Sequence, residues 1–347
     1  MVITRTPYRV SFFGGGTDYP TWFQEHGGAT LACAINKYCY LSVRYLPPFF
    51  EHRYRIVYSA TELCHKVAEI KHNGVRAVLS EHLPDRGVEI HHDGDLPARS
   101  GVGSSSSFVV GLLNAVNALK GNICSKYETA LEAIRIEQQV LGETVGIQDQ
   151  VMASFGGFQH IQIPRSGRIC VTPLFPPLER QLQFERHLIL FYTALSRTSS
   201  QIAGSYVPDL LKKEAALSRY VPMVEEAVRI LHDPTRSLAD FGHLLHEAWM
   251  IKRELSPVIS NSRIDDLYET ARRAGALGGK LLGAGGGGFM LLYADPAQHE
   301  KIRSSLSQLI EVPVSIDPSG SQILFFDRQQ DYSFEERKRV FETQQPQ

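Results

Sequence analysis

The sequence predicts a two-lobed α+β protein. Its 347 residues are more than one hydrophobic core usually organises, so two lobes are the first expectation. Segments with the alternation of β-strands and segments with helical periodicity are interspersed along the chain. A proline-marked stretch at 173–183 is the best candidate for a boundary. It places one lobe at residues 1–178 and the other at 179–347.

The first predicted lobe begins with strands. Short runs rich in β-branched and aromatic residues, such as YCYLSVRYL at 38–46, favour a pleated and half-buried surface. Helical spacing of apolar residues appears further along the chain. We expect strands at 8–16, 38–46, 53–59, 88–97, 157–164 and 168–174, and helices at 104–119 and 126–141.

The second predicted lobe opens with an apolar strand at 187–195. Beyond Asp331 the acid- and glutamine-rich end is expected to form a helix or a frayed tail. The sequence contains no internal repeat. We expect helices at 212–232, 237–252 and 261–274, then a glycine loop, a strand, and a last helix and strand that ends in QILFFD.

The composition argues against two classes of partner. The formal net charge is −1, so no overall field favours nucleic acid or an anionic membrane, and we expect neither partner. Five scattered cysteines without a CxxC pair suit a reducing compartment. The most apolar stretch, 108–119, is too short to span a bilayer, and the N-terminus lacks the apolar run of a signal peptide. These features predict a cytoplasmic globular protein.

A glycine- and serine-rich segment, DLPARSGVGSSSS at 95–107, is the strongest feature of the sequence. Gly101 and Gly103 allow a tight turn and a close approach to a ligand. Four serines then begin a helix, whose first N–H groups lack partners and attract anions. The hydroxyls can donate to phosphate or bind Mg²⁺, although no lysine follows the glycines as in a Walker A loop. The alternative is a serine N-cap after a flexible loop.

Glu137 and Asp149 form a second candidate group. On the helix at 126–141, Glu137 shares the inward stripe of apolar residues, where a lone carboxylate is costly to bury. A Mg²⁺ ion would offset that cost. Asp149 is expected in a loop after the helix, where it can act as general base toward a substrate hydroxyl. The alternative is a glutamate at the edge of the stripe and an aspartate that caps the next helix.

The segment GAGGGG at 283–288 is the third candidate. So many glycines imply a backbone packed closely against something, such as nucleotide phosphates. A flexible linker is disfavoured because the loop lies between a helical pattern and an apolar strand. Two histidine patterns, EIHHDGD at 89–95 and HLLHE at 243–247, suggest metal sites only weakly. Adjacent strand residues point to opposite faces, and HLLHE has no third ligand nearby.

These motifs, in this order, resemble the GHMP kinases, the family named for galactokinase, homoserine kinase, mevalonate kinase and phosphomevalonate kinase. TPYRVSFFGGGTDYP at 6–20 is similar to the first family motif, 97–107 to the second and 280–289 to the third. The resemblance spans nearly the whole chain. It implies ATP and Mg²⁺ as cofactors, an N-terminal lobe like the second domain of ribosomal protein S5, and a ferredoxin-like C-terminal lobe.

The resemblance also implies roles for individual residues. Asp149 would orient or deprotonate the acceptor hydroxyl, and Arg9 would stabilise charge on the transferring phosphate. Ser105 and Glu137 would hold Mg²⁺, and adenine is expected near 58–63 or 70–78. The ATP phosphates would contact Gly101, Val102, Gly103, Ser104, Ser105, Ser106, Gly285 and Gly286, and the sugar would contact Gly15, Gly16, Asp18, Tyr19, Arg197 and Thr198.

Departures from the family pattern bear on the substrate. Galactokinases carry Glu-His where this chain has Gly15 and Gly16, which argues against galactose. FFGGGTDYPTWFQEHGG and FYTALSRTSSQI instead resemble the bacterial D-glycero-D-manno-heptose 7-phosphate kinases. These enzymes phosphorylate the anomeric hydroxyl and give a 1,7-bisphosphate for nucleotide-activated heptose and surface polysaccharide. Arg197 with Thr198 would suit the existing 7-phosphate, and the alternative is a structural ion pair for Arg197.

Two other functions stay open at this point. One is an anomeric kinase for an unphosphorylated sugar such as fucose or galactose. The other is a catalytically silent sensor of ATP and sugar, which is disfavoured because Arg9, Ser105, Glu137 and Asp149 are all present. The sequence predicts a small sugar phosphate as partner and leaves a homodimer open.

Overall fold

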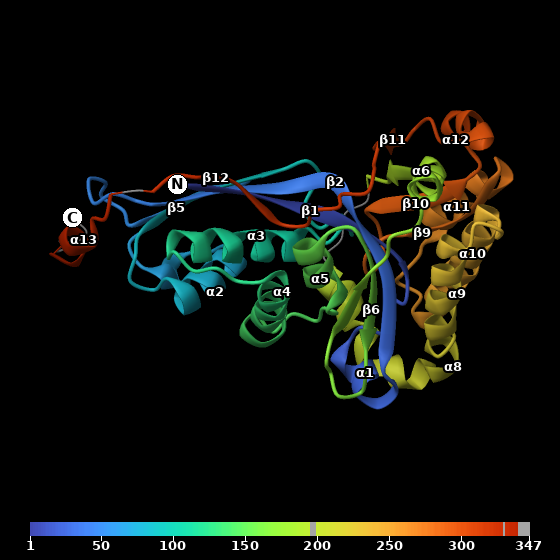
Figure 1. The fold of residues 1–347 in the computed structure, drawn as a ribbon, viewed down its shortest axis with the longest axis horizontal. Helices are drawn as coiled ribbons and strands as arrows, with labels where there is room; N and C mark the ends of the chain where they lie inside the picture. Colours follow the sequence, from blue (N-terminus) through green and yellow to red (C-terminus); the bar gives the residue numbers. More distant parts are fainter. Residues whose placement is uncertain (195–198, 329, 339–347) are drawn as a thin grey trace.

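The computed structural model describes residues 1–194, 199–328 and 330–338, and it contains two β-sheets that carry helices (Figure 1). The larger sheet is built mostly from the first half of the chain, and the smaller one from the second half. The expected α+β architecture is therefore confirmed. The predicted boundary at residues 178 and 179 falls at the start of helix α6, and its position stays a prediction.

The larger sheet has eight strands. Six of them follow the order β12-β1-β2-β5-β3-β4, and the other two form a branch in which β6 pairs with β2 and β7 pairs with β6. The long strand β2 pairs with β6 near its start and with β5 near its end. Strand β12 comes from the C-terminal part of the chain and pairs with β1. The strands are β1 (Val2–Phe13), β2 (Gly28–Tyr45), β3 (Tyr54–Val57), β4 (Thr61–Cys64), β5 (Val88–Gly94), β6 (Phe158–Ile163), β7 (Cys170–Pro173) and β12 (Gln322–Phe326).

Helices cover one face of this sheet, and α3 is the central one (Figure 1). It is apolar almost all round because the sheet covers one side of it and other helices cover the opposite side. Ser107 Oγ donates to the carbonyl of Pro7 at 2.8 Å, which fixes the start of α3 against β1. The helices of this half are α1 (Pro20–His26), α2 (Asn73–His82), α3 (Ser104–Leu119), α4 (Lys126–Arg135) and α5 (Gln148–Phe155).

The smaller sheet is antiparallel with the order β11-β8-β10-β9, and long helices pack beside it (Figure 1). Gly242 on α10 meets Gly278 on β9, where a Cβ at Gly278 would lie 1.9 Å from the Gly242 carbonyl oxygen. The elements of this half are β8 (Leu188–Tyr192), β9 (Ala276–Leu281), β10 (Phe289–Ala294), β11 (Ile310–Glu311), α6 (Leu178–Arg186), α7 (Ser199–Gly204), α8 (Glu214–Leu217), α9 (Tyr220–His232), α10 (Leu238–Leu255), α11 (Ser262–Arg273) and α12 (His299–Ser305). Helix α13 (Ser333–Lys338) lies instead at the far end of the larger sheet, where Glu336 pairs with Arg53 (Figure 1).

A buried aromatic cluster joins the two halves. Phe12 on β1 stacks on Phe158 with ring centroids 5.4 Å apart, and it meets Phe184 and Phe241 edge-on. These rings come from the first sheet, from α6 and from α10. Aromatic pairs of this geometry stabilise a core beyond the area that they bury. The cluster therefore holds the second half of the molecule against β1, close to the motifs that the sequence singled out.

Most expected elements are present with shifted ends, and three differ in kind. The helix expected at 126–141 ends as an α-helix at Arg135 and continues as a π-helical turn, Ile136–Val140. The helix expected at 212–232 is divided into α8 and α9, and Pro222 lies in the first turn of α9, where a missing N–H is tolerated. Helix α5 begins where a loop was expected. Among the described residues, no helix is long and apolar enough to cross a membrane.

Candidate active site

Two loops of the candidate site pack backbone against backbone. We call residues 97–107 the serine loop and residues 283–288 the glycine loop. A Cβ on Gly283 would lie 2.6 Å from Gly101 Cα, and a Cβ on Gly288 would lie 2.1 Å from the Ser100 carbonyl oxygen. Phe289 N–H also donates to that carbonyl at 3.1 Å. Only glycine permits this approach, so the fold brings together two motifs that are far apart in the sequence.

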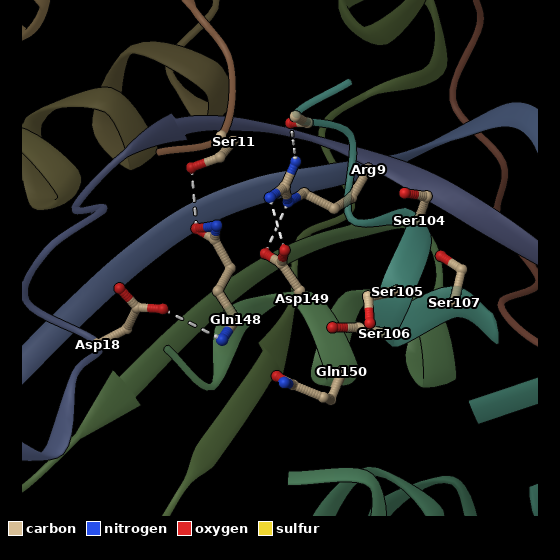
Figure 2. A network of polar contacts seen from close by, with 12 residues as sticks. Arg9, Ser11, Asp18, Ser104, Ser105, Ser106, Ser107, Gln148, Asp149 and Gln150 are labelled. Carbon is tan, nitrogen blue, oxygen red and sulfur yellow. Dashed lines mark hydrogen bonds and ion pairs between the residues drawn. The ribbon is translucent and has the colours of Figure 1, made fainter. Parts of the chain in front are cut away.

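Arg9 and Asp149 form a bidentate ion pair beside the serine loop (Figure 2). Arg9 Nε donates to Asp149 Oδ1 at 2.7 Å, and Arg9 Nη2 donates to Asp149 Oδ2 at 2.6 Å. Arg9 Nη1 donates to the Gly101 carbonyl at 2.6 Å. The Arg9 side chain is 6% exposed, whereas that of Asp149 is 29% exposed. The guanidinium is thus fixed, while the carboxylate keeps one side open to a reactant.

The expected loop position of Asp149 is wrong, because Asp149 lies in the first turn of α5. Its carboxylate does not cap that helix, since the Arg9 guanidinium binds both oxygens. A negative side chain near a helix N-terminus is electrostatically favourable. Helix α5 therefore presents Asp149 from a rigid element rather than from a loop.

Gly103, not a serine, caps the start of α3. Its φ of 77° lies in the left-handed region, which glycine adopts without strain. The serine hydroxyls bind elsewhere: Ser104 Oγ accepts from Arg99 N–H at 3.2 Å, and Ser105 Oγ donates to Glu137 Oε1 at 2.9 Å. The alternative of a serine N-cap is therefore excluded. The helix start keeps free N–H groups of the kind that bind anions.

Glu137 is fully buried on the π-helical turn that follows α4. Such single π-turns often occur at functional sites. Its carboxylate accepts from Ser105, from Ser106 Oγ at 2.7 Å and from Gln150 Nε2. Burial raises the pKa of Glu137 to about 7, and the three hydrogen bonds act in the opposite direction. The inward position expected for Glu137 is confirmed, and the partner expected for it, Ser105, is in contact.

The surroundings of Glu137 fit a divalent cation. Within the part of the chain that the structure describes, no basic side chain forms an ion pair with this carboxylate. Gln150 Oε1, on the neighbouring amide, is buried without a hydrogen-bond partner. A buried oxygen of this kind requires an explanation, and carboxylate, hydroxyl and amide oxygens are ligands that Mg²⁺ accepts.

Asp18 lies on the side of the Arg9–Asp149 pair that faces away from the serines of α3, next to Gln148 (Figure 2). Its carboxylate accepts from Gly16 N–H at 3.1 Å and from Gln148 N–H at 3.2 Å. Burial, and then the nearby charge of Asp149, raise the pKa of Asp18. Gln148 also accepts from Ser11 Oγ at 2.9 Å. Two carboxylates thus face one region from two directions.

Gly16 packs closely against α8 beside Asp18. Gly16 has φ of 108°, and a Cβ there would lie 3.1 Å from Leu217 Cδ2. A large side chain at this position would have to displace α8 and strain the backbone. The neighbouring Tyr19 has its pKa raised by burial first and by the Tyr206 hydroxyl among the further causes. Gly16 N–H donates to Asp18, and Tyr206 is an unexpected neighbour of Tyr19. A sugar beside residues 15, 16, 18 and 19 stays a prediction.

Of the other expected site residues, some lie outside the described part of the chain and others make backbone contacts of their own. Arg197 and Thr198 lie outside the described residues. Val102 is buried, and its carbonyl accepts from Arg9 N–H. Gly286 N–H donates to the Ile259 carbonyl at 2.9 Å, so a phosphate there would have to displace that bond. A Cβ on Gly285 would meet the backbone of Ile259 at 2.7 Å.

Both segments expected near adenine meet at one aromatic cluster. His72 stacks on Phe108 with ring centroids 4.6 Å apart and meets Tyr58 edge-on. Glu62 accepts from the Tyr58 hydroxyl and from His72 N–H. Phe108 lies one turn after the serines on α3. An adenine beside this cluster stays a prediction.

Sequence reasoning missed two lysines of the site, Lys252 and Lys280. Both are buried, at 8% and 5% exposure, near the glycine loop. Lys252 lies on the apolar stripe of α10, which is the same signal that identified Glu137 on its helix. The missed residue Gln148 gave no such signal, because its role depends on contacts with Ser11 and Asp18.

The weak histidine patterns have structural partners. His91 binds Glu89 at 2.9 Å on the surface of the sheet, whereas His92 meets the Phe108 ring. His246 Nδ1 binds the Tyr268 hydroxyl at 2.7 Å. No group of three or more His, Cys, Asp or Glu side chains arranged to hold a metal is found in residues 1–194, 199–328 and 330–338.

Together these groups can support transfer of a charged group to a hydroxyl. A partly exposed carboxylate, Asp149, binds a fixed guanidinium and lies near the buried carboxylate of Asp18. The start of α3 and the buried carboxylate of Glu137 lie on the other side of the pair. A general base, a positive charge and a phosphate cradle are the parts that phosphoryl transfer requires.

Comparisons with known proteins agree with this geometry. A model of the N-terminal domain of GHMP kinases matches residues 63–157, and a model of the C-terminal domain of GHMP kinases matches residues 213–311. Together the two ranges cover more than half of the chain. The first range contains the serine loop, Glu137 and Asp149, and the second contains the glycine loop.

Two relatives match most of this chain. A D-glycero-alpha-D-manno-heptose 7-phosphate kinase from Campylobacter jejuni is 28% identical over 320 residues, which cover 87% of this chain and 92% of the relative. A bifunctional fucokinase/GDP-fucose pyrophosphorylase from Arabidopsis thaliana is 26% identical over 351 residues, which cover 89% of this chain but 31% of that longer protein.

Solved structures show the same fold. A D-glycero-D-manno-heptose 1-phosphate kinase from Bacteroides thetaiotaomicron superposes with a TM-score of 0.70 at 22% identity, over 94% of this chain and 100% of the other. A putative sugar kinase from Campylobacter jejuni superposes with a TM-score of 0.67 at 25% identity, over 93% and 97% of the two chains. The expected two-lobed kinase fold is thereby confirmed.

Proposed function

Because the chain belongs to the GHMP kinase family and is a sugar phosphotransferase, we propose that it phosphorylates the anomeric hydroxyl of D-glycero-D-manno-heptose 7-phosphate. The donor is ATP and the product is the 1,7-bisphosphate. The arrangement that carries the proposal is the Arg9–Asp149 pair between the serine loop and Asp18. The similarity to the Campylobacter heptose 7-phosphate kinase over most of both chains supports the choice of sugar.

The transfer step uses this chain's own residues as follows. The acceptor hydroxyl lies between Asp18 and Asp149, and Asp149 orients it and takes its proton. The hydroxyl oxygen forms a bond to the γ-phosphorus as the bond from that phosphorus to the β–γ bridging oxygen breaks, and ADP leaves. Arg9 stays fixed by Asp149 and Gly101 and stabilises the charge on the transferring group. Positioning supplies much of the rate because the reactants are held together.

Ser105 and Glu137 would hold Mg²⁺, and the buried Gln150 Oε1, which has no hydrogen-bond partner, lies beside them. Bound there, Mg²⁺ would neutralise phosphate charge. The helix start at Ser104 and the glycine loop hold the rest of the triphosphate. Arg197 and Thr198 receive the 7-phosphate, since a guanidinium fork matches phosphate oxygens.

A panel of sugars tests the choice of substrate. The kcat/KM for heptose 7-phosphate should exceed that for neutral heptose, fucose or galactose by at least about 10²-fold, because a site built for a phosphate rejects sugars that lack it. Arg197→Ala should raise KM for the sugar phosphate, whereas Arg186→Ala, which removes an exposed arginine of α6, should not. ATP consumption measured across the panel decides the question, and a preference for neutral hexoses would disprove the proposal.

A fucose-type kinase is the second candidate, and the match to a plant fucokinase over 89% of this chain favours it. It shares the catalytic groups and differs only in whether the site holds a second phosphate. A silent sensor has no supporting observation, because each residue of the transfer step is present. Turnover of any sugar in the panel excludes it.

The buried Glu137 should make the stability of the fold depend on pH, and bound Mg²⁺ should cancel that dependence. Its pKa is raised from 4.5 to about 7, mainly by burial, so folding favours the protonated form. This contribution is complete below about pH 4.5 and is lost as the pH rises through about 7, and it amounts to about 3 kcal/mol at most. Bound Mg²⁺ compensates the ionised carboxylate, so Mg²⁺ should raise Tm more at about pH 8 than at about pH 6.

A matched pair of variants locates this effect. Glu137→Gln cannot ionise, and its Tm should no longer respond to Mg²⁺ in a pH-dependent way. Glu132→Gln removes a carboxylate on the preceding helix that pairs with Arg135, and it should respond like the wild type. An equal Mg²⁺ response in Glu137→Gln would place the metal elsewhere.

A further inference from the structure

Two lysines lie buried where the glycine loop meets the rest of the site. Lys252, on α10, donates from Nζ to the carbonyl oxygens of Leu281 at 2.9 Å and Gly283 at 2.6 Å. Lys280, on β9, donates to the carbonyl of Phe12 at 2.9 Å. Their partners are backbone carbonyls, and neither lysine forms an ion pair within the described residues. The transfer step described above uses neither of them.

The charge around these lysines is unbalanced. Burying a cation is costly unless an anion compensates it. Burial and repulsion from Lys280 and Arg9 lower the pKa of Lys252 well below its usual range. Burial and Arg9 lower the pKa of Lys280 to about 7, and Asp18 acts in the opposite direction. Three basic side chains thus share this region with two carboxylates, Asp149 and Asp18, and the two lysines hold their protons weakly until an anion binds.

A continuous path of contacts joins Lys252 to the catalytic pair. Lys252 holds the Gly283 carbonyl, and Gly283 packs directly on Gly101 of the serine loop. The Gly101 carbonyl accepts from Arg9, which binds Asp149 on its other side. Lys280 ties β9 to β1, the strand that carries Arg9. The second half of the molecule therefore positions both loops and the catalytic arginine through two lysines.

We propose that Lys252 is a positioning residue that clamps the glycine loop onto the serine loop, and that Lys252 and Lys280 together supply buried positive charge for the phosphates of the nucleotide. The inference rests on the proposed ATP site. A fixed charge in a buried region acts strongly because little water screens it. The fold sets the positions of the two lysine ammonium groups before the nucleotide binds, so binding requires little reorganisation.

Calorimetric binding of ATP with Mg²⁺, without sugar, tests the clamp. Lys252→Met keeps the apolar stem and removes the charge and both hydrogen bonds. Its Kd for ATP should rise about 10- to 100-fold, as expected for lost hydrogen bonds to a charged group, while binding of adenosine stays unchanged. A Kd for ATP equal to that of the wild type would overturn the proposal, even if Tm falls.

Lys126→Met is the matched control. Lys126 also donates from Nζ to two backbone carbonyls, those of Phe155 at 3.0 Å and Ser319 at 2.7 Å. It lies outside the candidate site and joins α4 to the C-terminal part of the chain. The control should lower Tm without changing Kd for ATP. A rise in Kd equal to that of Lys252→Met would show that the effect is general destabilisation and would overturn the clamp.

Proton uptake tests the charge separately from the structure. The charged groups that face Lys280 are Arg9 on β1, Asp18 after β1 and Lys252 on α10. Anionic phosphates favour the charged ammonium, so ATP binding at about pH 8 should take up protons. Binding enthalpies in buffers of different ionisation enthalpy measure this uptake, which should fall in Lys280→Met and Lys252→Met but not in Lys126→Met. Equal uptake in all four proteins would overturn the charge role.

The outcomes separate this inference from the proposed function. If the wild type does not bind ATP with Mg²⁺, the nucleotide site itself is wrong. If the wild type binds ATP and both lysine variants bind it equally well, only the role of the lysines is wrong.

Discussion

The Asp149→Asn variant should lose most of its sugar kinase activity, with kcat lower by about 10²- to 10⁴-fold. Asparagine keeps the shape of the side chain but cannot accept a proton. It also cannot hold Arg9 through two charged hydrogen bonds of 2.7 and 2.6 Å. ATP binding should change little, because the serine and glycine loops are unaltered. Steady-state kinetics with saturating sugar phosphate and ATP measure the loss.

Loss of folding must be separated from loss of chemistry in this variant. Removing one partner of a buried ion pair can destabilise a protein strongly, although Asp149 is 29% exposed and the effect should be moderate. Asp317→Asn is the matched control, because Asp317 is 3% exposed and accepts from Tyr38 and from two backbone N–H groups outside the site. It should lower Tm and leave kcat near the wild-type value. Near-normal turnover in Asp149→Asn would rule out an essential carboxylate.

The Arg9→Met variant should lower kcat by about 10³-fold or more, as arginines that stabilise phosphoryl transfer do in other enzymes. Methionine retains the apolar stem but leaves Asp149 and the Gly101 carbonyl without their shared partner. The affinity for sugar should change less than kcat, because Arg9 acts on the charge of the transferring group. Arg55→Met, which removes an ion pair with Glu89 on the sheet surface, should leave both values unchanged.

The double variant gives a second test of this pair. Arg9 and Asp149 act as one unit, so Arg9→Met combined with Asp149→Asn should cost far less than the product of the two single losses. Losses in kcat that simply multiply would show that the two residues act independently, contrary to the proposed mechanism.

Local patterns predicted the elements that bear the site. The helix at 104–119 has the expected bounds, because a glycine turn, a run of helix-starting serines and an apolar stripe all lie within it. The π-turn at Glu137 was not predicted, since it depends on how the chain closes after α4. Strand β9 was missed because two adjacent glycines in ALGGKL hide its strand pattern. Gly278 is needed where α10 packs closely, and Gly279 where β10 does.

Residues of the site were predicted where a single motif or stripe contains them. Ser105 and Glu137 are in contact as expected. Glu137 lies on the inward stripe of its helix, whereas Ser105 is exposed and contacts it from the first turn of α3. Asp149 was placed in a loop because nothing in GIQDQ marks the start of a short helix. Lys252 and Lys280 were overlooked, although a lysine on an apolar stripe is the same signal that a buried glutamate gives.

The sequence by itself determined the order of the motifs, the inward position of Glu137 and the family to which the chain is similar. These properties depend on spacings of a few residues along one segment. The tertiary structure alone decided that Asp149 pairs with Arg9, 140 positions away, and that two lysines of the second half hold the glycine loop. It also decided that β12 completes the first sheet. Such contacts depend on how whole strands and helices pack, and no local spacing records that packing.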